Sequence, residues 1–162
     1  HVHRARYLFG FIDRHVWRYR QDAHRTWFHH RVRARAAGPG GSLTGDTAQV
    51  VNYGEDGTAV TAVPDTGYHF VDWSDGSTDN PRTDTNVTAD VNVTATFAIN
   101  TYTLDYAAGT GGSLTGETSQ TVNYGEDGTP VTAVPDTGHH FVNWSDGSTD
   151  NPRTDTNVTA DV

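Results

Sequence analysis

Residues 40–91 recur at residues 111–162, an offset of 71, and 46 of the 52 aligned positions are identical. This period is longer than one turn of a solenoid and is close to the length of a small domain. The repeat therefore indicates tandem copies of one module, and it argues against a single enzyme built around a unique site. A chain of 162 residues has room for two such modules, neither of which can bury a large core.

Charge divides the chain near residue 37. Residues 1–37 carry a net charge of +7 and residues 38–162 a net charge of −16, with no lysine anywhere. An acidic surface repels nucleic acid and anionic membranes, and it suits a hydrated, extracellular setting. Cysteine is absent, which excludes disulfides and thiolate chemistry. Because the chain begins with His and has no Met, we expect any secretory signal to lie upstream of it.

Short alternating runs between Gly, Asp and Asn clusters predict strands and almost no helix. The clearest runs are residues 91–99 and 102–106, which are separated by little more than Asn100. No flexible spacer lies between these runs, so we expect the junction to hold the two modules in a fixed, extended relation. Further strands are predicted at residues 49–53, 58–63, 68–73 and 83–88.

Strict alternation over residues 68–73 would place Phe70 and Trp73 on opposite faces of a strand. One bulge at Val71 or Asp72 would bring both aromatic rings into the core, and we expect that bulge.

Differences between the two copies should gather at solvent-exposed positions. Ala59 becomes Pro130, which removes an amide donor and predicts a strand start or a sheet edge. Tyr68 becomes His139, which predicts a partly exposed position, because a buried imidazole needs polar partners.

The second copy reads Tyr-Thr-Leu-Asp-Tyr at residues 102–106, Gln-Thr-Val-Asn-Tyr-Gly at 120–125 and Gly-His-His-Phe-Val-Asn-Trp at 138–144. The first copy closes on Val-Asn-Val-Thr-Ala-Thr-Phe at residues 91–97. This order resembles the divergent internalin-type B-repeat of bacterial surface proteins, and the resemblance covers residues 38–162. It implies small β-grasp-like modules strung in tandem in secreted or wall-attached, often adhesin-like proteins. It brings no catalytic residues.

We therefore expect a mainly β chain with two tandem β-grasp-like modules, at residues 36–99 and 100–162. The second module lacks a counterpart of the closing strand at residues 92–97, which leaves an open sheet edge. In the first module the opening strand is altered. Arginines replace Tyr102, Leu104 and Tyr106 of the second copy, so a strand paired in the same way would turn three guanidinium groups toward the core: Arg31, Arg33 and Arg35.

Residues 1–35 form a basic segment, rich in Arg and His, that we expect to be disordered or weakly helical, with a short amphipathic helix near residues 5–20. Its interleaved aromatic residues raise nucleic-acid binding as one reading. We favour another, since repeat similarity begins abruptly at Ala36: the segment is a linker or the out-of-frame translation of a GC-rich repeat. We expect no nucleic-acid partner.

We predict no catalytic residue, no cofactor and no metal. Histidines at positions 24, 29, 30, 139 and 140 lack convincing ligand spacing. Calcium has more candidate ligands, because aspartates crowd one Gly-containing loop of each copy, although turn formation explains them better. These weak candidates are Asp72, Asp75, Asp79, Asp146 and Asp150. Glycosylation sequons, which would matter only after export from a cell that glycosylates, begin at Asn86, Asn92, Asn143 and Asn157.

The sequence thus predicts a non-catalytic spacer or stalk of a secreted or cell-surface protein, extracellular and not inserted in the membrane, whose partners are neighbouring repeats of its own chain. The alternative is a module that binds another surface protein or a glycan through exposed aromatics and acidic loops. Candidate contacts for that alternative are Tyr68, Trp73 and Trp144. Burial of both tryptophans would favour the spacer, whereas open indole faces would favour binding.

Overall fold

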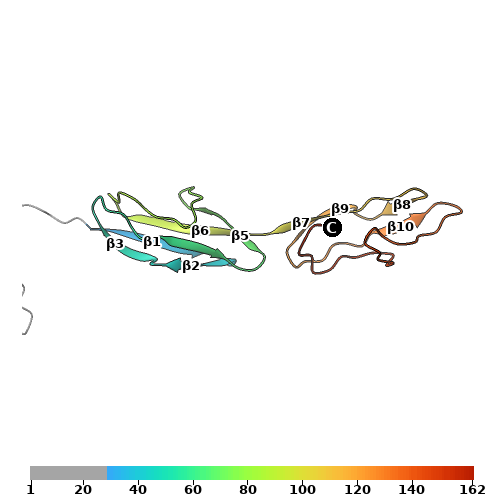
Figure 1. The fold of residues 1–162 in the computed structure, drawn as a ribbon, viewed down its shortest axis with the longest axis horizontal. Helices are drawn as coiled ribbons and strands as arrows, with labels where there is room; N and C mark the ends of the chain where they lie inside the picture. The colour runs from blue at the N-terminus through green and yellow to red at the C-terminus, as the bar shows by residue number, and fades with distance from the viewer. Residues whose placement is uncertain (1–28) are drawn as a thin grey trace, which may run out of the picture.

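The structure is a computed structural model and describes residues 29–162, so the helix expected at residues 5–20 lies outside the described part. Figure 1 shows two modules arranged end to end, with β1–β6 in module 1 and β7–β10 in module 2. The strands are β1 (His29–Ala37), β2 (Gly41–Gly45), β3 (Ala48–Asn52), β4 (Val60–Pro64), β5 (Tyr68–Trp73), β6 (Val91–Ile99), β7 (Thr101–Asp105), β8 (Gly112–Thr115), β9 (Ser119–Asn123) and β10 (Thr132–Pro135). Residues 29–162 contain no helix, hence none that could cross a membrane.

Module 1 is built on a four-stranded mixed sheet in the order β3-β1-β6-β5. The central strands β1 and β6 run parallel, and each outer strand is antiparallel to its neighbour. The antiparallel pair β2-β4 forms a second layer, whose buried Val60 and Ala62 share one core cluster with Ala95 and Phe97 of β6. Two parallel strands between antiparallel neighbours agree with the expected β-grasp-like module.

The opening strand of module 1 contradicts the sequence expectation. Strand β1 begins at His29, so module 1 starts earlier than residue 36. The exposed fractions of Val32 and Ala34 are 2% and 7%, whereas Arg31 and Arg35 are exposed and Arg33 is half-buried. The expectation that these three arginines would face the core is therefore wrong.

The reason is a shift of one residue in the pairing of β1. Tyr102 of β7 lies opposite Val122, and a shift-free counterpart would place Arg31 opposite Val51. His30 takes that place instead. Because strand side chains alternate between faces, this shift turns all the arginines away from the core and brings Val32 inward.

Hydrogen bonds outside the ladder confirm the shift. The amide of Arg31 donates to Asp90 Oδ1, whereas in module 2 the donor to the equivalent Asp161 is Thr103. The repeat offset holds again from Gly40 onward, so the connection over residues 35–40 takes up the extra residue.

The predicted bulge in β5 is confirmed. Pairing between β5 and β6 skips Val71, which is 41% exposed. Phe70 and Trp73 therefore lie on one face with their ring centroids 5.6 Å apart, and Phe70 also meets Phe97 edge-on at 6.2 Å. Tyr68 is half-buried and its counterpart His139 is exposed, which confirms the partly exposed position.

One predicted strand is wrong and one strand was missed. Residues 83–88 form no strand. Residues 74–90 run as a loop that meets β4 through a backbone bridge between Val60 and Arg82 and through the side chain of Asn80. The missed strand is β2, whose Gly-Ser-Leu-Thr-Gly sequence reads as a turn. The strands predicted at 49–53 and 58–63 correspond to β3 and β4 with shifted ends.

Module 2 keeps only part of this architecture. It has the antiparallel pairs β7-β9 and β8-β10. Residues 139–144 form no strand, although they match β5 at four of six positions. In module 1, β5 pairs only with β6, and the described chain holds no second β6. Local sequence alone does not keep this segment in a sheet.

Candidate functional site

The junction between the modules consists of one residue, Asn100, between β6 and β7. Its amide donates to the carbonyl of Gly67 in module 1 at 2.8 Å, and its carbonyl accepts from the amide of Tyr124 in module 2 at 2.8 Å. Its side-chain Oδ1 lies 2.8 Å from Nδ1 of His69. The connecting residue is thus tied to both modules, as a short fixed junction requires.

An aromatic contact supports the same junction. The ring of Tyr124 lies against Gly67, where the backbone has a φ of +81° and no side chain intervenes. Tyr124 is half-buried, whereas the equivalent Tyr53 of module 1 is 61% exposed. Nothing lies within 4 Å of a Cβ built on Gly138, the counterpart of Gly67. Tyr124 is therefore half-buried by its contact with module 1 at the junction.

Both candidate binding tryptophans are buried. The exposed fraction is 0% for Trp73 and 8% for Trp144. Each indole Nε1 donates at 2.8 Å to a backbone carbonyl, that of Asp79 or of Asp150. Tyr68, the third candidate, packs its ring over Gly40. Neither indole presents an open face to a flat ligand, whereas Tyr68 is half-buried.

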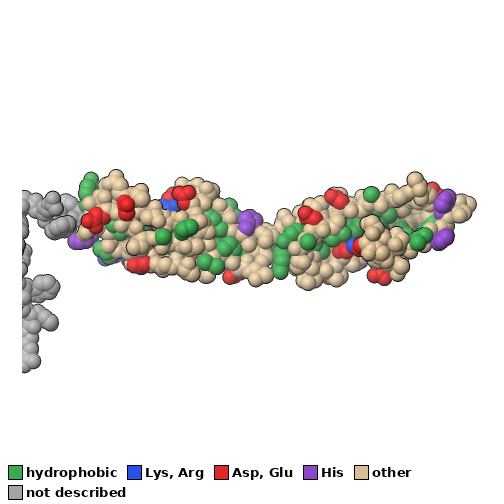
Figure 2. Space-filling model, viewed as in Figure 1, with side chains coloured by type: hydrophobic (Ala, Val, Ile, Leu, Met, Phe, Trp, Pro, Cys, Tyr) green, Lys and Arg blue, Asp and Glu red, His purple; other side chains and the backbone are tan. Residues whose placement is uncertain are grey.

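An arginine in each module holds the acidic loop against the core. In module 1, Arg82 forms ion pairs with Asp75 at 2.8 Å and Asp84 at 2.5 Å, and its guanidinium lies 5.7 Å from the Trp73 ring centroid. On the face shown in Figure 2, acidic side chains are spread over both modules and little arginine is visible. The loop carboxylates thus serve the fold by neutralising a nearly buried cation.

Module 2 repeats this cluster and adds a phenol. Arg153 pairs with Asp146 at 2.7 Å and Asp155 at 2.6 Å, and it lies over the rings of Tyr106 and Trp144. The Tyr106 hydroxyl donates to Asp155 Oδ2 at 2.5 Å. Module 1 has no such phenol, because Ala34 occupies the position of Tyr106.

These contacts shift the pKa values of the loop groups. Burial, together with the hydrogen bond to Asp155, raises the pKa of Tyr106 to about 12. The hydrogen bond from Arg153 lowers the pKa of Asp155 despite its partial burial. For Asp75, burial alone would raise the pKa, but hydrogen bonds from Arg82 and from the Ser77 amide outweigh that effect and lower it.

The calcium candidates are not brought together. Within residues 29–162, no three His, Asp or Glu side chains lie close enough to share a metal ion. Asp75 and Asp146 are engaged by arginines, and Asp79 and Asp150 contribute backbone carbonyls to the tryptophans. Asp72 is half-buried on β5. The geometry therefore gives these weak calcium candidates no support.

The other sequence candidates lie apart from any common site. His30 Nδ1 is 3.5 Å from Asp90, His139 and His140 are exposed, and position 24 falls outside the described residues. The four sequon asparagines, Asn86, Asn92, Asn143 and Asn157, are all exposed.

Sequence reasoning missed the polar side chains that fasten the loops. Gln49 is 7% exposed, and its amide bonds the backbone of Asp46 and Thr58. Asn80 holds both the amide and the carbonyl of Ala62, as a neighbouring strand would. Gln120 and Asn151 repeat these bonds. The sequence signal that could have pointed to these side chains is that the two copies carry the same residue at each position.

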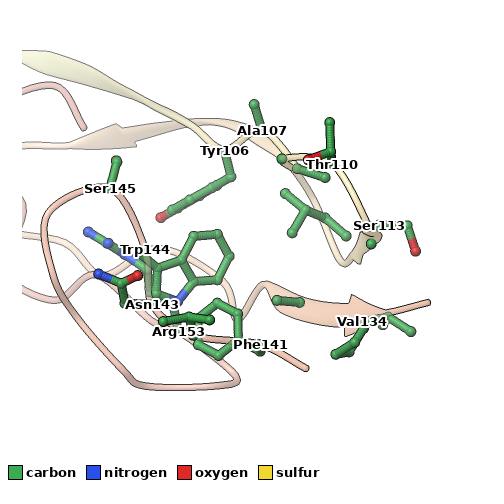
Figure 3. Close-up of a pocket in the computed structure, with 18 of the residues that line it drawn as sticks. Tyr106, Ala107, Thr110, Ser113, Val134, Phe141, Asn143, Trp144, Ser145 and Arg153 are labelled. Atoms are coloured by element: carbon green, nitrogen blue, oxygen red, sulfur yellow. The ribbon is translucent and has the colours of Figure 1, made fainter. Parts of the chain in front are cut away.

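A groove of about 770 Å³ lies in module 2. Figure 3 shows Tyr106 on one side of it and Phe141 and Trp144 on the other, with Val134 of β10 at one end. Val142 beside it is 66% exposed. In module 1 the corresponding space is filled by β6.

Comparison with known proteins gives one family. The family model described as the divergent InlB B-repeat domain matches residues 33–101 and, a second time, residues 102–162. No curated protein matches the chain, and no solved structure matches it.

Proposed function

The chain belongs to the divergent InlB B-repeat family, and we propose that its modules act as a spacer or stalk that projects other parts of a bacterial surface protein. Tandem B-repeats are typical of such proteins, and these modules are non-catalytic structural units. We propose three properties for this protein: a spacer role, an extracellular location and an adhesin-like character.

The junction is the observation that carries the proposal. A stalk transmits length and direction only if successive modules do not swing freely. Here one residue separates β6 from β7, and Asn100 bonds Gly67 on one side and Tyr124 on the other. The end-to-end arrangement in Figure 1 converts each added repeat into added length.

Burial of the tryptophans weighs against the alternative of glycan or protein binding through exposed aromatics. The indole N–H groups of Trp73 and Trp144 donate to backbone carbonyls, and each ring lies against an arginine. A glycan platform would need an accessible ring face, and neither ring offers one.

Residual dipolar couplings of the full chain test the spacer proposal. If the junction is stiff, the couplings of residues 29–99 and 101–162 fit one alignment tensor. A Gly-Ser-Gly insertion after Asn100 serves as the flexible control and should require two tensors of different magnitude. Two unequal tensors for the unaltered chain would contradict the proposal.

A further inference from the structure

We propose that the outer face of the module 1 sheet, which points away from the β2-β4 layer, is a docking surface for an extended acidic polypeptide segment. The segment lies along β1 and pairs its carboxylates with an arginine row. This row consists of Arg31, Arg33 and Arg35, three of the four arginines in residues 29–99. The inference goes beyond the spacer function and does not depend on it.

The one-residue shift of β1 gathers the arginine row on one face. Val32 and Ala34, which lie between the arginines, are buried, and Ala34 shares a core cluster with Val60 and Ala62 of β4. Because strand side chains alternate between faces, the arginines point to the opposite side of the sheet. Successive members of the row are two residues apart, or about 7 Å along the strand. The outer face therefore carries positive charge at a regular spacing.

The neighbouring strands flank the arginine row with side chains of two different kinds. On β3, Val50 lies opposite Arg31 and is 68% exposed. On β6, the exposed Asn92 lies opposite Arg33. A chain lying along β1 thus meets apolar surface on one side and an amide able to form hydrogen bonds on the other.

The carboxylates of the module lie elsewhere, apart from one at the end of the row. The arginine ion pairs found within residues 29–162 are those of the two loop arginines described above. Asp90 accepts a hydrogen bond from the amide of Arg31 at 2.9 Å, so its charge lies at this end of the row. It would repel a carboxylate of the partner there. Arg33 and Arg35 should therefore contribute more to binding than Arg31.

Module 2 does not carry this row on its own outer face. The hydrogen bonds to the equivalent loop carboxylates make Thr103 the counterpart of Arg31. The pairing of β7 with β9 and of β1 with β3 makes Asp105 the counterpart of Arg33. Strand β7 thus has a negative charge where β1 has a positive one, and module 2 serves as an internal control.

An acidic polypeptide matches the arginine row in both spacing and chemistry. The side chains on one face of an extended peptide also repeat every two residues, so carboxylates at alternate positions meet successive guanidinium groups. An arginine can bind a carboxylate through two parallel hydrogen bonds. Charge complementarity and a shared repeat distance therefore identify the kind of partner.

Two other polyanions fit this face less well. Single-stranded nucleic acid binds through aromatic rings on which its bases stack. Strands β1 and β3 have no Phe, Tyr or Trp, and the one on β6, Phe97, faces the core. A sulfated polysaccharide would gain nothing from the exposed Val50, whereas the apolar stems of peptide side chains can pack on it.

The test uses the whole chain and a short synthetic peptide in which glutamate and threonine alternate. In an NMR titration the amide signals of β1 and of residues 48–50 and 92–96 should shift, and those of β7 should not. Binding should weaken as the salt concentration rises, because the contacts are ionic. A peptide of the same composition with its glutamates in one block should bind about fivefold more weakly or worse, because its carboxylates lose the two-residue spacing.

Variants of the arginine row locate the binding surface. Arg33→Gln and Arg35→Gln should each weaken binding about two- to fivefold, and Arg31→Gln should weaken it less. The triple variant should lose the peptide-induced shifts. Arg35 is exposed, so Arg35→Gln keeps the fold and decides the outcome if the triple variant is unstable. A charge-matched control replaces three arginines of residues 1–28 by glutamine, at Arg4, Arg6 and Arg14.

The charge-matched control should bind the alternating peptide as tightly as the unaltered chain does. Equal binding of the block peptide would mean that net charge alone attracts the ligand, and this would overturn the proposal. Loss of binding in the charge-matched control, shifts confined to module 2, or no binding at millimolar peptide would overturn it as well. So would tighter binding of single-stranded DNA or of a sulfated polysaccharide to the arginine row.

Discussion

The ring of Tyr124 in module 2 lies against Gly67 in module 1, so closely that a Cβ atom on Gly67 would come within 3.0 Å of three ring atoms. This contact and the hydrogen bonds of Asn100 hold the two modules together at the junction. The repeat supplies its own controls, since Tyr53 and Gly138 occupy the same local positions without the contact.

The substitution Gly67→Ala should disturb the junction more than Gly138→Ala. Both glycines have positive φ, +81° and +83°, so both variants bear the strain of an alanine in that region. Only Gly67 also meets the Tyr124 ring, and such overpacking costs about 1–3 kcal/mol. Urea unfolding should therefore show the larger loss of stability for Gly67→Ala. Equal losses would mean that the ring contact contributes nothing.

The one-residue shift of β1 can be tested with neighbouring residues. Val32 is 2% exposed, so Val32→Ala should lower the free energy of unfolding of module 1 by about 1–3 kcal/mol. Arg31 is exposed, so Arg31→Ala should change it by no more than about 0.5 kcal/mol. Thermal unfolding followed by circular dichroism compares them. A larger loss of stability for Arg31→Ala than for Val32→Ala would support the unshifted register, in which the arginines face inward.

Module 2 should lose stability at alkaline pH. The pKa of Tyr106 is raised from 10.0 to about 12 in the folded chain, so its contribution is complete below pH 10 and is lost as the pH rises from 10 to 12. Tyr106→Phe should remove this pH dependence. Absorbance near 295 nm should show a late-titrating phenol that disappears in Tyr106→Phe. A titration curve of Tyr106→Phe that loses one phenol near pH 10 and none near pH 12 would contradict the raised pKa.

Much of the fold could be predicted because the strands carry their own alternation. Strands β5 and β6 were predicted at their observed bounds. The spacing of Phe70 and Trp73 predicted a bulge at Val71 or Asp72, and the structure has it at Val71. The shift of β1 could not be predicted, because it depends on the choice between two faces of one strand. Burying Val32 and Ala34 avoids desolvating three guanidinium groups, and that energetic comparison needs the tertiary pairing.

The candidate site was predictable only in outline. The short junction was visible in the sequence, but the bonds of Asn100 require knowledge of which turn lies beside it. The loop at residues 74–90 was misread in part because its Thr and Val residues favour strands. Its conformation depends instead on side chains such as Asn80, which bonds β4 18 residues away, and Arg82, which pairs with the loop carboxylates.

A distance measured across the junction tests the central claim most directly. The chain has no cysteine, so Val50→Cys and Thr121→Cys, at equivalent exposed positions of β3 and β9, place two spin labels one repeat apart. Double electron–electron resonance should give a single narrow distance distribution, which a Gly-Ser-Gly insertion after Asn100 broadens. A distribution in the unaltered chain as broad as that of the insertion variant would contradict a stiff stalk.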